Sequence, residues 1–468
     1  LVGSLLGPSN VTVSGAGKVT LSAVADPSFN PGDTVTFTVA GGTLELTNSA
    51  ALGTTAAGNL ASLVLSGGAF YYNNAATATL AHPITLSGGT LSGGGNNQTF
   101  SGAVSVTAAS FVNMADLNGL STAAAARNIT LSGAVTGSGA VTIDSNDTAT
   151  SGNQTNGNFV LNNAASTWNG ALNLIRGNAF FQNVAAGGTA TAYVGFDGII
   201  NFNQFGRVTY RNVNGASFTR TAAINFAAGA MGELRPDNLS TTLAENYTLT
   251  QSGALNLNAG SIARFALGDA ASNLVLSGGV VLNGIASFGV NSGDADSLVT
   301  ISGIGISGTG TLNINDEAGV WTTTSTRLAI NAASTFIGDT TLTEGFLILG
   351  HKDALSAGSL TILGASTLDL FAVLLGGAVA LLPIFAQMLG VGELGFGLLR
   401  AATSMGAVLM SIYLIVRPPL ERAGPALYGS FAVFGLCIIG FGLSIHLASA
   451  LGLGLQAAFI FSFLFLLI

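Results

Sequence analysis

Histidine is the side chain that most often transfers protons in hydrolases, and this chain of 468 residues has three. Two of them, His82 and His351, lie in the polar first part of the chain. A nucleophile motif of the form Gly-x-Ser-x-Gly does not occur near either one or elsewhere in the sequence. The sequence therefore argues against a hydrolytic triad, and we expect both histidines to have a turn or surface role.

Glycines at 303, 305 and 308 fit the Gly-x-Gly-x-x-Gly spacing of a dinucleotide-binding loop. That loop binds phosphate only when a helix begins directly after it, because the helix N-terminus supplies the N–H donors. No helical pattern follows Gly308, and a chain with 65 glycines contains such spacings by chance. We therefore predict no nucleotide cofactor, and we assign no other cofactor.

Two short acidic segments have oxygen atoms of the kind that calcium binds, namely 293–297 and the pair Asp144 and Asp147. The Gly-Gly-x-Gly-x-Asp nonapeptide of calcium-binding repeats is absent, so we expect solvated turns at both places. Carboxylate pairs can also hydrolyse glycosides, but spacing along the chain does not test whether two carboxylates lie close together. We assign no catalytic residue and no metal ligand.

Four arginines concentrate positive charge near the middle of the chain: Arg207, Arg211, Arg220 and Arg235. We interpret them as solvent-facing strand ends rather than as an anion-binding patch. The chain as a whole has a net charge of −8, and only 7% of its residues are charged, against roughly a quarter in soluble proteins. Because an acidic, charge-poor surface repels phosphate, nucleic acid is not an expected partner.

These residues must be positioned by β-strands, because apolar and small polar residues alternate through most of 10–365. Glycine and asparagine supply the turns between the short runs. The only cysteine, Cys437, lies near the end of the chain, so the β-rich part has neither disulfides nor a cysteine-based zinc site.

A longer sequence unit occurs twice, at 163–177 and at 331–345. Both copies read Asn-Ala-Ala-Ser-Thr-aromatic-x-Gly-x-x-x-Leu-x-x-Gly, and each follows a Gly-x-Gly strand. Short strands at regular spacing suit either a sandwich or a solenoid, but the repetition favours a parallel β-solenoid. In that fold we expect the aromatic residues Trp168 and Phe336 to occupy equivalent positions in their coils.

The segment 334–370 gives this pattern a family resemblance. Its residues read Ser-Thr-Phe-Ile-Gly-Asp-Thr-Thr-Leu-Thr-Glu-Gly-Phe-Leu-Ile-Leu-Gly, followed by Leu-Thr-Ile and Leu-Asp-Leu. This segment resembles the autotransporter-associated β-strand repeat of bacterial passenger domains. The resemblance implies that 1–369 is a right-handed parallel β-helix with a structural or adhesive, non-catalytic role. It also implies a location at the cell surface or outside the cell, and a glycan or another cell-surface partner. A polysaccharide-acting solenoid enzyme is the alternative.

After residue 369 the composition changes to almost continuous apolar residues. Four hydrophobic spans follow, at 370–389, 396–416, 427–447 and 450–468. A membrane helix needs about 20 apolar residues, and each span approaches or reaches that length. The sequence therefore predicts an all-α transmembrane segment of about four helices over 370–468, with the lipid bilayer as its partner.

This tail has a second family resemblance. Residues 368–383, Leu-Asp-Leu-Phe-Ala-Val-Leu-Leu-Gly-Gly-Ala-Val-Ala-Leu-Leu-Pro, are similar to the seventh helix of major facilitator superfamily exporters. Residues 417–424 resemble the short basic loop that follows the eighth helix. The resemblance implies a fragment of an exporter in the inner membrane. Because that family transports with two six-helix halves, we expect no transport by this chain alone.

The two resemblances imply conflicting locations. The arginine-bearing loop 417–426 would be cytoplasmic by the positive-inside rule, which places the start of 370–389 inside the cell as well. Residues 1–369 would then lie inside the cell, where a passenger-type domain has no evident use. We therefore predict a chimera of two unrelated sequences joined near 364–371, with a β-solenoid domain at 1–369 and a helical domain at 370–468.

Overall fold

The computed structural model describes most of the chain, in segments separated by short gaps. The described residues are 10–22, 35–52, 60–74, 77–94, 97–114, 128–145, 157–182, 196–212, 217–238, 247–267, 272–292, 298–314, 327–355, 358–362, 378–416, 433, 436–437, 439–444, 446 and 448–467. The chain divides into two compact units, Leu1–Leu363 and Gly364–Ile468. The predicted junction at 364–371 lies outside the described residues.

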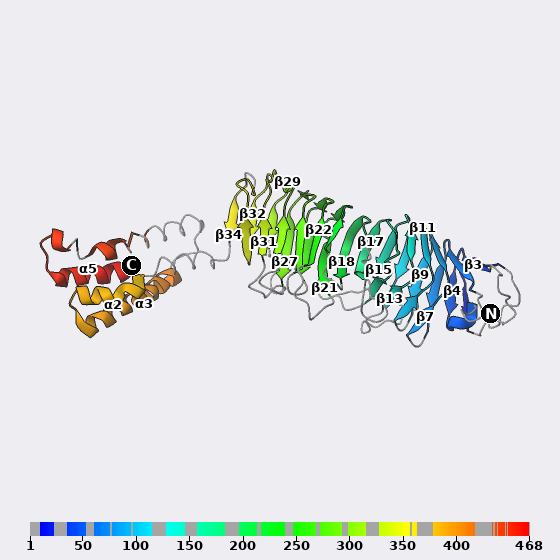
Figure 1. Cartoon of the computed structure of the whole chain (residues 1–468), viewed down its shortest axis with the longest axis horizontal. Helices are drawn as coiled ribbons and strands as arrows, with labels where there is room; N and C mark the ends of the chain where they lie inside the picture. The colour runs from blue at the N-terminus through cyan, green and yellow to red at the C-terminus, as the bar shows by residue number, and fades with distance from the viewer. Residues whose placement is uncertain are drawn as a thin grey trace. The chain divides into compact units, whose positions relative to one another are not determined.

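The first unit consists of short strands stacked coil upon coil in three sheets with parallel ladders (Figure 1). One six-stranded sheet comprises β1 (Val11–Val13), β3 (Thr36–Val39), β5 (Ser62–Leu65), β8 (Ile84–Ser87), β11 (Val104–Ala108) and β14 (Val135–Gly137). The other comprises β19 (Phe218–Arg220), β22 (Tyr247–Gln251), β25 (Ser272–Leu276), β28 (Leu298–Ile301), β31 (Arg327–Ile330) and β33 (Phe346–Leu349). A single turn of 3-10 helix spans Ser49–Leu52.

The third sheet has 22 strands, in two ladders joined by the long strands β17 (Leu172–Gln182) and β18 (Ile200–Asn212). The first ladder also contains β2 (Lys18–Leu21), β4 (Thr43–Leu46), β6 (Ala69–Tyr72), β9 (Thr90–Gly93), β12 (Ser110–Asn113), β15 (Val141–Asp144), β20 (Ile224–Phe226), β23 (Leu255–Leu257), β26 (Val280–Leu282) and β29 (Ile306–Gly308). The second contains β7 (Ala78–Leu80), β10 (Gln98–Phe100), β13 (Asn128–Leu131), β16 (Asn158–Leu161), β21 (Met231–Asn238), β24 (Ile262–Leu267), β27 (Ala286–Ser292), β30 (Leu312–Ile314), β32 (Thr340–Leu342) and β34 (Leu360–Ile362).

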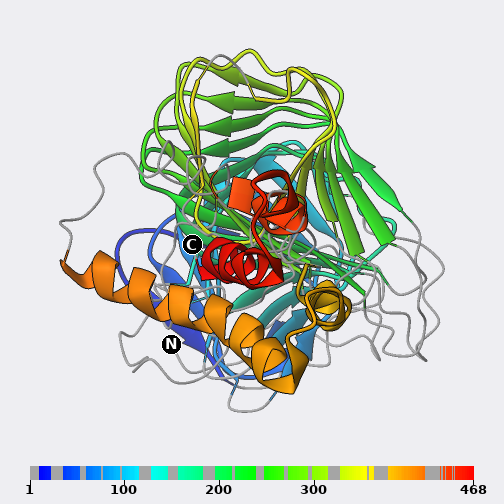
Figure 2. The same ribbon diagram turned by 90° about the vertical axis from the view of Figure 1, so that its left-hand side faces the viewer.

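The core of this unit is made of columns of apolar side chains that run from coil to coil. One column, in register across five strands, is Phe37, Leu63, Ile84, Val104 and Val135, and all five are buried. Figure 2 looks along the stack and shows successive coils one behind another. Each fully buried aliphatic side chain contributes about 2 kcal/mol relative to exposure. The alternation read from the sequence therefore produces the interior, as predicted for a parallel β-solenoid.

The two copies of the repeated unit have matching backbone contacts. The amide nitrogens of Thr167 and Trp168 both donate to the carbonyl of Val135 in the preceding coil. In the second copy, the amides of Thr335 and Phe336 donate in the same way to one carbonyl, that of Ile306. Trp168 and Phe336 are 4% and 1% exposed. The two aromatics thus occupy equivalent, inward-facing positions, as the repetition predicted.

Asparagine side chains form a row of hydrogen bonds, which we call the asparagine ladder, on the outward side of β17, β18, β20 and β23. Asn201 donates to Asn173 at 2.7 Å, Asn225 to Asn201 at 2.8 Å, and Asn256 to Asn225 at 2.7 Å. Each amide has both a donor and an acceptor, so one residue can bond to the coil before it and the coil after it. The ladder therefore fixes the register of β17, β18, β20 and β23.

The second unit contains the helices α2 (Ala378–Met388), α3 (Gly392–Val416) and α5 (Leu455–Leu467), with further helical residues within 433–450. Its small core includes Leu382, Leu399 and Phe441, and Phe385 stacks on Phe441 with ring centroids 4.4 Å apart. Many other apolar side chains are exposed, among them Leu394 at 79%.

The prediction of about four transmembrane helices over 370–468 is wrong. In the described part of the chain, no helix combines the length and the hydropathy that crossing a membrane requires. The described helices α2 and α5 are shorter than the apolar spans 370–389 and 450–468 that were counted as membrane helices. α2 has 11 residues and α5 has 13, against the roughly 20 that a membrane helix needs. The predicted cytoplasmic loop 417–426 lies outside the described residues.

Candidate functional site: an arginine-rich face of the solenoid

The strands β17, β18, β21 and β24 place arginines on the outward side of adjacent coils. In one row, Arg207 of β18 is in register with Glu233 of β21, which is in register with Arg264 of β24. The neighbouring residues Val208 and Leu234 are part of the hydrophobic core, so the alternate residues face outward. We call the following set the arginine face: Arg176, Arg207, Arg211, Arg235 and Arg264, of which Arg264 is almost completely buried.

Glu233 is the buried carboxylate of this face and is 6% exposed. The Nη2 atom of Arg207 donates to Oε2 of Glu233 at 3.1 Å. The Nε atom of Arg207 lies 2.7 Å from Oε1, but its N–H is not aimed at that oxygen, so this second contact is an ion pair without a hydrogen bond. Removing one partner of such a buried pair leaves an uncompensated charge. The Arg207–Glu233 pair is therefore already engaged, and this row is poorly suited to chemistry.

Asp144 forms a second ion pair on the same side of the solenoid. Its two oxygens accept from Nε and Nη2 of Arg176, each at 2.9 Å, in a two-pronged arrangement. Asp144 and Glu233 belong to strands three ladder steps apart, which is about 14 Å at the spacing of adjacent strands. Glycosidase carboxylates lie roughly 5 to 9.5 Å apart. These two residues therefore lack the geometry of a glycosidase pair.

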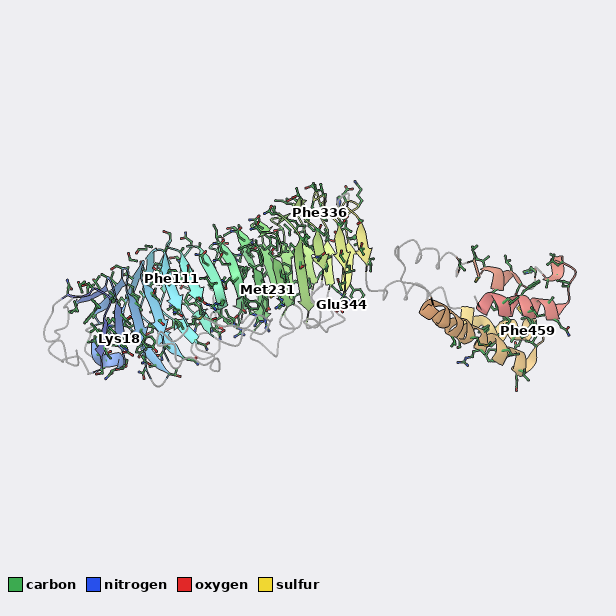
Figure 3. All side chains as sticks on the ribbon, turned by 180° about the vertical axis from the view of Figure 1, so that it is seen from behind. Lys18, Phe111, Met231, Phe336, Glu344 and Phe459 are labelled. Atoms are coloured by element: carbon green, nitrogen blue, oxygen red, sulfur yellow. The ribbon has the colours of Figure 1, made fainter. Side chains whose placement is uncertain are left out.

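Arg211 and Arg235 form the remaining part of the arginine face, beyond the Glu233 row. The guanidinium of Arg211 lies over the ring of Phe180, 5.2 Å from its centroid. Arg235 is in register with Thr209 of the preceding coil. The Nε atom of Arg235 and the hydroxyl of Thr209 are buried, and neither has a hydrogen-bond partner. Met231, labelled in Figure 3, marks the start of the same strand, β21.

Arg220 is not a solvent-facing strand end, as we had predicted, because it is fully buried. Its Nη1 donates to Oε1 of Gln251 at 2.6 Å, and its Nη2 donates to the carbonyl of Gly198. Its guanidinium also lies 5.7 Å from the ring centroid of Tyr210. The interpretation fails because its partners come from the coils before and after, 22 and 31 residues away. Arg207 lies within β18 and is mostly buried as well.

Asp197, beside Arg220, closes the same corner of the coil. Burial opposes ionisation of Asp197, but hydrogen bonds from the hydroxyl and amide of Thr221 and from the amide of Ala222 outweigh it. The pKa of this carboxyl is therefore lowered from its usual 3.8. The corner is a polar network that holds two successive coils together, although the Nε of Arg220 is left without a hydrogen-bond partner.

The other residues considered from the sequence have structural environments. His82 is buried, not at the surface, and its Nδ1 lies 2.9 Å from the carbonyl of Ala61. His351 is partly exposed and accepts from the amide of Asp353 in a turn. The glycines at 303, 305 and 308 all have positive φ. Gly303 and Gly305 lie in the connection between β28 and β29, and Gly308 is the last residue of β29, so their spacing serves turns.

Most of the candidate calcium positions lie outside the part of the chain that the structure describes. Residues 293–297 and Asp147 lie outside the described residues, and Asp144 is paired with Arg176. Across the described segments, no group of three or more histidine, cysteine, aspartate or glutamate side chains is arranged to hold a metal ion.

Arg176, Glu233 and Arg264 were not among the residues predicted from the sequence. The segment 207–211 reads Arg-Val-Thr-Tyr-Arg, and this alternation of polar and apolar residues predicts a strand whose arginines face outward. Its partners could not be identified, because the coil length that brings β21 and β24 beside it is irregular. Comparison with protein-family models, curated proteins and solved structures finds no match.

Proposed function

We propose that the β-solenoid is a non-catalytic adhesive or structural domain that acts at the bacterial cell surface or outside the cell. The observation that carries this proposal is the continuity of the parallel ladders from β1 to β34, over a filled apolar core. Such a stack has a large outward surface for its volume, and each coil stabilises the next. The passenger-type sequence resemblance of 334–370 supports the same role.

The side chains of the arginine face support binding rather than catalysis. Its two described carboxylates, Asp144 and Glu233, are both engaged by arginines. The histidines His82 and His351 lie on other coils, in β-turn or buried environments. Binding needs accessible donors held in fixed register, and Arg176, Arg211 and Arg235 are partly exposed on neighbouring strands.

Cells that express the full chain test this proposal in two ways. Protease added to intact cells is expected to release peptides from 10–362, and attachment of these cells to surfaces is expected to exceed that of cells without the gene. A chain that stays protected in intact cells, or attachment that does not change, would contradict the proposal.

The matched control is a full chain whose solenoid cannot fold. Leu255→Asp with Leu257→Asp places two charges in the core, where both leucines are buried. This variant is expected to lose attachment at equal expression. Attachment that persists would mean that the folded solenoid is not responsible.

A further inference from the structure

One outward row of the first six-stranded sheet consists almost entirely of hydroxyl-bearing residues. The row alternates with the buried column of the same strands, and the register brings one of its residues from each coil side by side. We call this set the threonine row: Thr12, Thr38, Val64, Thr85, Ser105 and Thr136. Every member is partly or fully exposed.

A second outward row lies beside the threonine row at the end of its first four strands. It begins two residues further along each strand and contains Ser14, Ala40, Ser66 and Ser87, all partly or fully exposed. The amides of Ala40 and Ser66 bond to the carbonyls of Val13 and Val39, so the parallel ladder continues through this row. Residues two apart on a strand are separated by about 6.6 to 6.8 Å, and neighbouring strands by about 4.8 Å. The face is therefore a regular grid of small side chains.

The chemistry of this grid is neutral. The six strands β1, β3, β5, β8, β11 and β14 contain no charged residue, and their one aromatic residue, Phe37, points into the core. An anionic polymer is held by guanidinium or ammonium groups, which these strands lack. A threonine hydroxyl donates one hydrogen bond and accepts others, and its methyl group adds a small apolar surface. The face suits a neutral ligand that repeats at a fixed distance.

Solid water has such a repeat. Tetrahedral hydrogen bonding at an O···O distance of about 2.75 Å places second-neighbour oxygens about 4.5 Å apart. One hydroxyl per coil, at about 4.8 Å, comes within a few tenths of an ångström of that spacing. Because liquid water has no fixed lattice, only the solid gains from hydroxyl groups held in register. The ladders and the filled core hold these groups in place before any ligand arrives, so little ordering entropy is lost on binding.

We propose that the threonine row and the serine-rich row beside it form an ice-binding face. Its hydroxyl groups bond to lattice oxygens of a growing crystal, while the methyl groups of the threonines and of Val64 pack against the crystal surface. This inference goes beyond the adhesive function and does not depend on it. Its ligand is crystalline water.

Thermal hysteresis, the gap between the melting and freezing temperatures of a single ice crystal, tests the proposal with the full chain. We expect a measurable gap, and we expect the chain to enter slowly growing ice, which excludes ordinary solutes. Thr85→Tyr should reduce the hysteresis by about fivefold, because the ring stands above the row and holds the lattice away from the neighbouring coils. Thr136→Tyr, at the end of the row, should reduce it by about twofold.

Thr90→Tyr is the matched control. Thr90 is the same residue type, is partly exposed and begins β9, in the next sheet. Its hysteresis should equal that of the wild type. Hysteresis of the wild type no larger than that of an equal concentration of serum albumin, or equal losses in Thr85→Tyr and Thr90→Tyr, would overturn the inference. Urea denaturation checks that each variant is folded. If Thr85→Tyr fails to fold, Thr136→Tyr decides, because its site is fully exposed, and unchanged hysteresis in that variant would reject the face.

Discussion

The two copies of the repeated unit, 163–177 and 331–345, have the same backbone contacts but different neighbours. Trp168 of the first copy stacks on Phe196, with ring centroids 4.6 Å apart, and its Nε1 donates to the carbonyl of Gly139 at 2.9 Å. Phe336 of the second copy is also buried, but its ring has no N–H group that could donate a hydrogen bond. Beyond the second copy, Phe346 and Ile362 are 43% and 46% exposed. One sequence pattern therefore gives the same geometry in both coils, while the neighbouring coils determine how strongly each is held.

Truncating the two aromatics should show this difference most clearly. Trp168→Ala is expected to lower the free energy of unfolding by about 4 kcal/mol, and Phe336→Ala by about 3 kcal/mol. Trp168→Ala leaves a larger cavity and also leaves the carbonyl of Gly139 without its indole donor. Urea denaturation of the full chain measures both changes. A larger loss for Phe336→Ala would mean that the neighbouring coils do not set the stability of a copy.

Replacing the glycine at the eighth position of each copy by alanine should have a smaller and nearly equal effect on stability. A Cβ at Gly170 would lie 1.9 Å from the carbonyl oxygen of Gly139, and one at Gly338 would lie 2.1 Å from that of Gly310. We expect Gly170→Ala and Gly338→Ala to destabilise by about 2 kcal/mol each, because the coils must separate locally. Melting temperatures compare the two with Gly17→Ala, where a Cβ meets no atom within 4 Å. A loss as large in Gly17→Ala would refute the steric explanation.

The smallest expected difference between the two copies is a dependence of local stability on pH, which only the second copy should show. Asp339, where the first copy has Ala171, accepts from the amide and the hydroxyl of Ser359, both at 2.8 Å. The hydrogen bond from the amide of Ser359 and, next in size, the hydrogen bond from its hydroxyl lower the pKa of Asp339 from its usual 3.8. A lowered folded-state pKa means that this stabilisation is complete above about pH 5 and is lost as pH falls through the lowered value.

Hydrogen exchange at the amide of Ser359 measures that loss. Protection in the wild type should exceed protection in Asp339→Asn at pH 6, and the two should converge in strong acid. The amide of Ala171, in the first copy, should show the same protection in both chains at each pH. A wild-type advantage that persists below pH 2 would contradict the assignment to this carboxyl.

The sequence predicted those parts of the fold that depend on local alternation and on repetition. The pattern of Ser62–Leu65 is enough to place Leu63 and Leu65 inside, and the duplicated unit is enough to equate Trp168 with Phe336. The register between coils could not be predicted, because the loops between strands differ in length. For this reason the burial of Arg220, whose partners lie in the adjacent coils, was not foreseen.

The prediction for the helical unit failed for a different reason. Hydropathy counts apolar residues but does not fix helix length, and the described helices α2 and α5 have only 11 and 13 residues. The candidate site was hidden in a similar way. Arg235 and Thr209 are 26 residues apart in the sequence, and only the register of β18 with β21 brings them together.

The asparagine ladder has a mechanical consequence. Its bonds, like those of the strands, connect one coil to the next, so a pulling force along the stacking direction loads them row by row. Successive rungs are 24 and 31 residues apart, from Asn201 to Asn225 and from Asn225 to Asn256. Release of one coil would lengthen the tether by about 80 to 100 Å, at about 3.4 Å for each extended residue. A solenoid under tension would therefore extend in steps and dissipate work at each one, while the remaining coils keep their fold.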